Sequence, residues 1–142
     1  MRALLDVNVL IALLDQDHSM HEQARGWLAA NARRGWASCP ITQNGCVRVM
    51  SHPAYPNGLP VGAIMERLEE ATGSAYHEFW ADDVSLLDTR VADRTRIHGP
   101  RQLTDLYLLA LAVRHRGCFV SFDSSIALAA IKGAEPKHFV IV

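Results

Sequence analysis

Three aspartates, Asp6, Asp105 and Asp123, stand where apolar segments of the chain begin or end. Asp6 closes the first apolar run, Asp105 opens the run Leu106–Val113, and Asp123 closes the run that starts at Phe119. An unpaired charge beside a core segment is costly to bury, so such carboxylates need a partner. Carboxylate oxygens are preferred ligands of Mg²⁺ and Mn²⁺, and a cation held there can activate water against a phosphodiester. If the fold brings the three acids together, they form a hard-cation site.

Apolar segments and helical patterns alternate along the chain, which predicts an α/β fold with a central parallel β-sheet flanked by helices. The expected strands are residues 2–6, 36–39, 84–87, 118–122 and 138–142. The expected helices are residues 7–14, 19–33, 41–50, 60–72, a polar helix from about 91 to 99, 104–116, and a last one from 124 or 125 through 130. Turn-forming residues predict a loop over 51–60.

These elements put all three acids at one edge of the sheet. Asp6 and Asp123 follow strands, and Asp105 lies in the first turn of a helix that Thr104 can cap. Ligands of parallel α/β sheets bind beyond the carboxyl ends of the strands, so this edge is the expected site. Helix capping alone could explain Asp6 and Asp123, but it explains Asp105 less well because Thr104 precedes it.

Composition narrows the class of protein. A chain of 142 residues with 49% hydrophobic and 20% charged residues predicts one globular domain over residues 1–142. Cys39, Cys46 and Cys118 lack C-x-x-C spacing, which suits the reducing cytoplasm better than a disulfide framework or a zinc ribbon. The apolar run Leu106–Val113 is far below the roughly 20 residues of a membrane span. A net charge of −1 gives no overall basic field, so polyanion binding would have to be local.

The segments around the three acids resemble the acidic motifs of PIN-domain ribonucleases, most closely the VapC-type toxins of bacterial toxin–antitoxin systems. The segments are Leu4-Leu-Asp-Val-Asn-Val-Leu-Ile, Gln102-Leu-Thr-Asp-Leu-Tyr-Leu-Leu-Ala-Leu-Ala and Val120-Ser-Phe-Asp. The resemblance implies a PIN-like domain and metal-dependent endoribonuclease activity with Mg²⁺, or Mn²⁺, as cofactor. Asp6, Asp105 and Asp123 match the metal-binding acids of the family.

The resemblance also implies supporting residues and partners. Ser121 matches a small hydroxyl residue that orients water or a carboxylate, and Asn8 resembles a polar position behind the metal ligands. The implied partners are an RNA substrate, a small antitoxin protein that blocks the site, and a second copy of the chain in a homodimer.

One position departs from the family pattern. Many PIN ribonucleases carry a glutamate on the helix after the second strand, whereas residues 41–48 contain no acid. Gln43 or Asn44 could supply a neutral oxygen in its place. Arg48, one turn after Asn44, could bind a substrate phosphate, could pair with an acid, or could be an ordinary surface arginine.

Two other functions remain open from the sequence. The missing glutamate is compatible with a non-catalytic PIN-like module that binds RNA or regulates. The opening Asp6-Val-Asn8 also resembles the first motif of haloacid-dehalogenase-type phosphatases, but Asn8 cannot donate the proton that the second aspartate of that motif supplies. Several arginines around the Asp105 segment could contact phosphates or simply be solvated: Arg94, Arg96, Arg101, Arg114 and Arg116.

Overall fold

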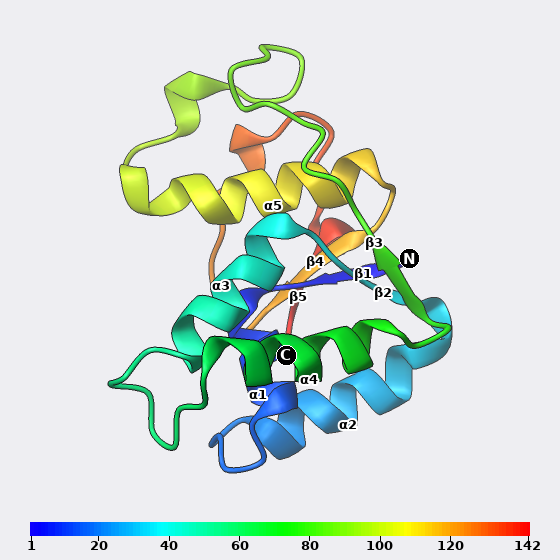
Figure 1. Ribbon diagram of the computed structural model, residues 1–142. Coiled ribbons are helices and arrows are strands. Elements are labelled where there is room, and N and C mark those ends of the chain that lie inside the picture. The colour runs from blue at the N-terminus through cyan, green and yellow to red at the C-terminus, as the bar shows by residue number, and fades with distance from the viewer.

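A computed structural model describes residues 1–142 as a parallel β-sheet between two layers of helices (Figure 1). The strands are β1 (Ala3–Leu5), β2 (Trp36–Ser38), β3 (His77–Phe79), β4 (Cys118–Ser121) and β5 (Phe139–Ile141). The helices are α1 (Val7–Leu14), α2 (His21–Asn31), α3 (Pro40–Met50), α4 (Val61–Thr72) and α5 (Leu103–Arg114). The order β3-β2-β1-β4-β5, with every pairing parallel, confirms the predicted α/β class.

Alternating strand residues supply the two halves of the core. On one face, Leu5 and Val120 pack in a cluster with residues of α1, α2 and α4. On the other face, Leu4 and Phe119 pack against the apolar residues of α5. Figure 1 shows α5 on the opposite side of the sheet from α1, α2 and α4. None of the helices combines the length and apolar composition that a membrane crossing requires.

The pairing of β1 with β4 fixes the two strand ends that carry acids. Leu5 aligns with Val120, and the Asp6 N–H donates to the Val120 carbonyl at 2.9 Å. Consequently Asp6 and Ser121 lie side by side at the carboxyl ends of β1 and β4, and Asp123 follows two residues after Ser121.

Two glycines allow close contacts at opposite ends of the central strands, Gly45 at the edge with the acids and Gly117 at the other edge. A Cβ on Gly45 of α3 would lie 2.7 Å from Val7 Cγ2, so its absence lets α3 approach the first turn of α1. A Cβ on Gly117 would lie 2.4 Å from the Arg2 carbonyl oxygen and 2.8 Å from the Trp80 ring, at the start of the β1–β4 pairing. All three distances are shorter than the van der Waals contacts of a real Cβ atom.

The predicted strand over residues 84–87 is wrong. Residues 81–90 instead form exposed turns in which Ser85 Oγ accepts the Leu87 N–H and Asp88 Oδ1 accepts the Arg90 N–H. Such local bonds from serine and aspartate compete with a strand ladder. The third strand is β3, which pairs with β2. Its residues His77 and Glu78 are polar, so the sequence shows no alternation of apolar and polar residues there.

Two predicted helices are also wrong. Residues 91–99 form no α-helix: Ala92 makes an isolated β-bridge with Ile131, and Arg94–Arg96 form a 3₁₀ turn in which Asp93 Oδ1 accepts the Thr95 N–H. Between Asp123 and Ala130 the one helical element is the 3₁₀ turn Leu128–Ala130, so no helix begins at Ser124 or Ser125.

Two helix starts differ from the prediction. α2 begins at His21 rather than Ser19, and its N-cap, Met20, makes no side-chain cap bond. The capping box of Ser19 and Glu22 is therefore absent. α5 begins at Leu103 after a 3₁₀ turn, which places Thr104 inside the helix and not at its cap.

Candidate active site

The fold brings the three aspartates together at the carboxyl edge of the sheet. One carboxylate oxygen from each of Asp6, Asp105 and Asp123 lies within 4.8 Å of the other two. Asp6 follows β1 and Asp123 follows the adjacent strand β4, while Asp105 comes from the first turn of α5. The convergence follows from the central pairing of β1 with β4 and from the packing of α5 on that pair.

Asp6 lies deepest in the cluster. It is buried, caps α1 by accepting the Val7 N–H at Oδ1 (2.7 Å), and accepts the Ser121 hydroxyl at Oδ2 (2.7 Å). Asp105 is half-buried and Asp123 is exposed, so the cluster opens to solvent on one side. Capping thus describes Asp6 correctly, but not Asp123, since no helix follows it. A carboxylate oxygen offers more than one lone pair, so the cap does not prevent Asp6 from binding a cation.

Ser121 connects the buried acid with the exposed one. Its hydroxyl donates to Asp6 and accepts the backbone N–H of Asp123 at 3.1 Å. Asn8 Nδ2 adds a longer contact to the same oxygen at 3.4 Å. The serine therefore fixes the orientation of Asp6 and the path of the chain at Asp123.

Asn8 leaves an unsatisfied group beside the cluster. Its Oδ1 atom is buried and has no hydrogen-bond partner in the protein. Buried amide oxygens almost always have a partner, so a water or a hydrated ion is the natural complement. Together with three convergent carboxylates, this oxygen fits a divalent cation with its bound water.

The electrostatics of the cluster favour a cation. Burial, followed by the negative charges of Asp6 and Asp123, raises the pKa of Asp105 to about 6. Burial also raises the pKa of Asp6, although the Ser121 and Val7 hydrogen bonds oppose the shift. Without a cation, Asp6 and Asp105 therefore retain protons more readily than ordinary carboxyls, and a bound cation would relieve the repulsion within the cluster.

The stability of the metal-free protein should depend on this shift. Between the ordinary value of 3.8 and about 6, folded Asp105 keeps a proton that the unfolded chain releases, so stability falls as pH rises through that window. The full shift would correspond to about 3 kcal/mol, and solvent screening of a half-buried group reduces it to about 1–2 kcal/mol. Urea unfolding in EDTA at pH 4–7, for wild type and Asp105→Asn, measures the difference. A difference that does not change with pH would contradict the shift.

The three polar residues of α3 that the sequence singled out differ in burial and in hydrogen bonding. Gln43 is half-buried, and its Nε2 donates to Ser38 Oγ at 2.9 Å, whereas Asn44 and Arg48 are exposed and make no side-chain hydrogen bond. Ser38 Oγ also pairs with His77 Nε2 at 2.7 Å. Of the two candidates for the missing glutamate, only Gln43 is held in a fixed orientation. The sequence did not predict that Ser38 and His77 lie beside Gln43. The one signal for Ser38 was its position near the end of a predicted strand, and His77 had none.

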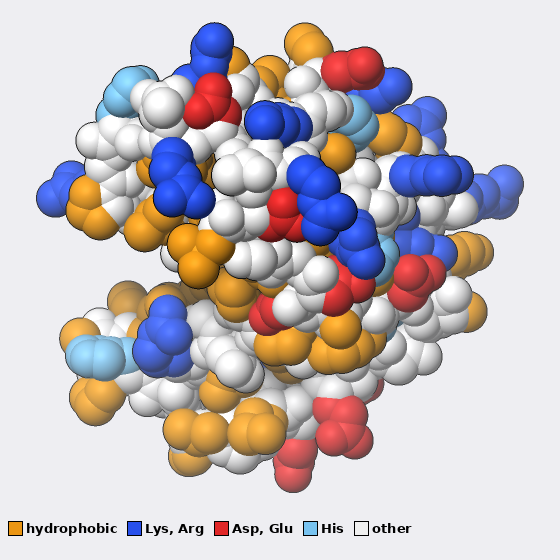
Figure 2. All heavy atoms as spheres, turned by 90° about the horizontal axis from the view of Figure 1, so that it is seen from above, with side chains coloured by type: hydrophobic (Ala, Val, Ile, Leu, Met, Phe, Trp, Pro, Cys, Tyr) orange, Lys and Arg blue, Asp and Glu red, His pale blue; other side chains and the backbone are white.

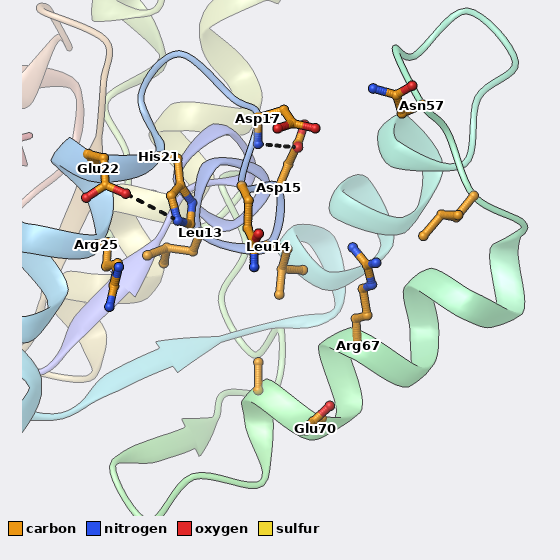
Figure 3. A pocket seen from close by; sticks show the side chains of 13 residues that line it. Leu13, Leu14, Asp15, Asp17, His21, Glu22, Arg25, Asn57, Arg67 and Glu70 are labelled. Carbon is orange, nitrogen blue, oxygen red and sulfur yellow. Dashed lines mark hydrogen bonds and ion pairs between the residues drawn. The ribbon is translucent and has the colours of Figure 1, made fainter.

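A separate groove of 1220 Å³ lies at the far end of α1. Figure 3 shows Asp15, His21 and Glu22 on one side of it, with Arg67 and Glu70 of α4 on the other. The groove begins at Leu13, seven residues after Asp6, and α1 rises about 1.5 Å per residue, so about 10 Å of helix separates the groove from Asp6. The groove and the acid cluster are therefore different sites.

A comparison with models of protein families identifies the family of this chain. The family model described as PIN domain matches residues 3–132. The chain belongs to the PIN-domain family. Membership confirms the resemblance carried by the acidic motifs, and it disfavours the haloacid-dehalogenase alternative, since the match covers the whole region that holds the acids.

The relatives of this PIN domain are VapC ribonucleases. It is 59% identical over 138 residues to Ribonuclease VapC44 of Mycobacterium tuberculosis, with 97% of each chain covered. It is 41% identical over 134 residues to Ribonuclease VapC39 of the same organism, covering 94% of this chain and 96% of the relative.

A solved structure supports the fold. The PIN domain resembles a chain in the crystal structure of VapBC2 from Rickettsia felis bound to a DNA fragment from their promoter, with a TM-score of 0.57. The two share 14% identity over 87% of this chain and 89% of the other. At that identity the likeness describes the fold alone.

Proposed function

We propose that this PIN domain is the endoribonuclease toxin of a VapC-type toxin–antitoxin pair and hydrolyses RNA phosphodiester bonds. The observation that carries the proposal is the cluster of Asp6, Asp105 and Asp123, whose oxygens lie within 4.8 Å of one another, in a chain 59% identical to Ribonuclease VapC44. A bare carboxylate cluster repels a phosphodiester, so the cluster requires a cation before it can serve such a substrate.

The cofactor of this proposal is Mg²⁺, with Mn²⁺ as the alternative, held by Asp6, Asp105 and Asp123. When bound, such an ion activates water and neutralises charge on the phosphate. The protein's own contribution is positional: Asp6 is held by two hydrogen bonds, and Ser121 keeps it aligned with Asp123. Asn8 Oδ1 offers an acceptor for water beside the acids.

The residues on α3 have supporting roles in the proposal. Gln43 takes the place of the glutamate found in many PIN ribonucleases, and its amide is held through Ser38. A neutral residue there reduces the negative charge at the site, which lowers the affinity for the cation. Arg48 is exposed without a carboxylate partner, so its guanidinium is free to contact a substrate phosphate.

The partners of the proposed toxin are RNA, a small antitoxin protein and a second copy of the chain. Val61 and Met65 lie one turn apart on α4, and each is more than half exposed, so they offer an apolar contact for a protein partner. Light scattering of the purified chain, alone and with its antitoxin, measures both assemblies. A monomer in both samples would contradict the protein partners.

Incubation with RNA tests the proposed function directly. Purified protein is expected to cut single-stranded RNA in Mg²⁺ or Mn²⁺, and EDTA is expected to abolish cleavage because the acids then lack their cation. Single-stranded DNA of the same sequence serves as the control substrate. Cleavage that persists in EDTA would contradict the metal-dependent mechanism. RNA binding without cleavage in either metal would instead support the non-catalytic PIN-like module.

A further inference from the structure

Positive charge is concentrated in one part of the chain. Residues 90–116 hold six arginines against two aspartates, a net charge of +4 in a chain whose total is −1. All six arginines are exposed: Arg90, Arg94, Arg96, Arg101, Arg114 and Arg116. The segment and α5 lie at the top of Figure 1, and Figure 2, seen from above, shows Lys and Arg side chains gathered over this face.

Not all of this charge is neutralised by neighbouring acids. Arg90, Arg96 and Arg114 form ion pairs with Asp88, Asp93 and Asp83, respectively. The other three arginines have no carboxylate partner, but one of them, Arg116, follows the end of α5 that is opposite to Asp105. Arg94 donates only to the Leu87 carbonyl, at 3.3 Å, and Arg101 makes no side-chain hydrogen bond or ion pair.

Each of these two arginines lies on a segment connected to one of the clustered acids. Arg101 belongs to the 3₁₀ turn that leads directly into α5, four residues before Asp105. Arg94 begins a 3₁₀ turn next to the segment that follows Asp123: the Asp93 N–H donates to the Ala130 carbonyl and the Lys132 N–H donates to the Val91 carbonyl, both at 2.9 Å.

We propose that Arg94 and Arg101 bind the phosphates of the RNA strand next to the cleaved bond. The inference rests on the proposed ribonuclease function, and it identifies the residues that would contact the RNA backbone beside the acid cluster. Guanidinium groups bind phosphate oxygens in a two-pronged geometry, and an arginine without a carboxylate partner is free to do so. A strand held there on the α5 side of the acids would place its next phosphodiester at the cluster.

Phosphate contacts of this kind carry no sequence information, and they make binding depend on salt. The test uses a 12-nucleotide single-stranded RNA in EDTA, so that binding is measured without cleavage. Each phosphate contact on a single strand contributes about 0.7 to the slope of log affinity against log salt concentration. The double variant Arg94→Gln/Arg101→Gln should therefore lower the magnitude of that slope by about 1.4.

The matched control removes two arginines from the opposite edge of the sheet. Arg33 and Arg34 are exposed, form no ion pair, and lie just before β2, so Arg33→Gln/Arg34→Gln makes the same charge change far from the acids. The control should keep the wild-type slope. In Mg²⁺, the Arg94 and Arg101 variant should raise KM with little change in kcat, because its contacts lie beside the reacting phosphate and not on it.

Equal slopes for the two double variants would overturn the assignment of Arg94 and Arg101 while leaving the ribonuclease proposal intact. This outcome would point to another role for these arginines, such as binding an acidic protein. No RNA binding by the wild-type protein in EDTA at low salt would overturn the proposed backbone contacts, whereas no RNA cleavage in Mg²⁺ or Mn²⁺ would overturn the ribonuclease proposal. A fall in kcat at unchanged KM would also contradict the backbone role, because it would place the arginines at the reacting phosphate.

Discussion

Replacing Asp105 by asparagine is expected to lower the RNA cleavage rate about 10²–10³-fold, with the fold retained. The carboxyl is half-buried and accepts no hydrogen bond from the protein, so the change breaks no structural contact. It does remove one of three charges that would hold the cation. In the absence of metal the variant should be at least as stable as wild type above pH 6, since it loses the repulsion from Asp6 and Asp123.

Cleavage of a fluorogenic RNA at several Mg²⁺ concentrations, with thermal unfolding in EDTA, checks both parts of this prediction. Glu66→Gln is the matched control, because Glu66 is an exposed acid on α4, and its activity should stay within about twofold of wild type. Full activity of Asp105→Asn would contradict a role of the acid cluster in cleavage. Loss of activity together with unfolding would attribute the effect to structure instead.

Replacing Gly117 by alanine is expected to destabilise the protein by about 3 kcal/mol, close to the upper range for overpacking. The added Cβ would meet the Arg2 carbonyl at 2.4 Å, and this backbone atom accepts the Cys118 N–H at 2.9 Å. Relief of the clash requires β4 to move away from β1. For a chain of this size the melting temperature should fall by about 10 °C.

Gly26→Ala provides the opposite control. Gly26 is exposed within α2, and a Cβ there would meet no atom within 4 Å. Alanine should therefore stabilise the helix by about 0.5–1 kcal/mol, since glycine costs more backbone entropy. Calorimetry of both variants separates the clash from a general glycine effect. Similar melting temperatures for the two variants would contradict the packing argument at Gly117.

The sequence predicted the sheet wherever apolar strands were flanked by clear helical patterns. β1, β2, β4 and β5 and the helices α1, α3, α4 and α5 lie close to their expected positions. β3 was missed because its residues are mostly exposed and polar, and its strand conformation comes from pairing with Trp36 at the sheet edge. Residues 81–99 contain turns made by serine and aspartate side chains, which apolar periodicity cannot reveal.

Part of the candidate site could also be predicted. The three acids were identifiable because each one stands where an apolar run begins or ends, and parallel strands end at the same edge. The unsatisfied oxygen of Asn8 and the bond from Gln43 to Ser38 depend on side-chain orientation, which no spacing in the sequence records. The unpaired state of Arg94 and Arg101 depends equally on which neighbouring acids the turns bring within reach.

The hydrogen bond between Asp6 and Ser121 joins residues 115 positions apart. In a chain that is still being synthesised, Asp6 is present early. Ser121 and Asp123, which complete the cluster, are added only when β4 and the two residues after it have been made. Until then β1 lacks one of its two neighbours in the sheet, and Asp6 lacks the bond that aligns it. The proposed nuclease is thus inert during most of its own synthesis, and a messenger RNA under translation is exposed to its activity only after the nearly complete chain has folded.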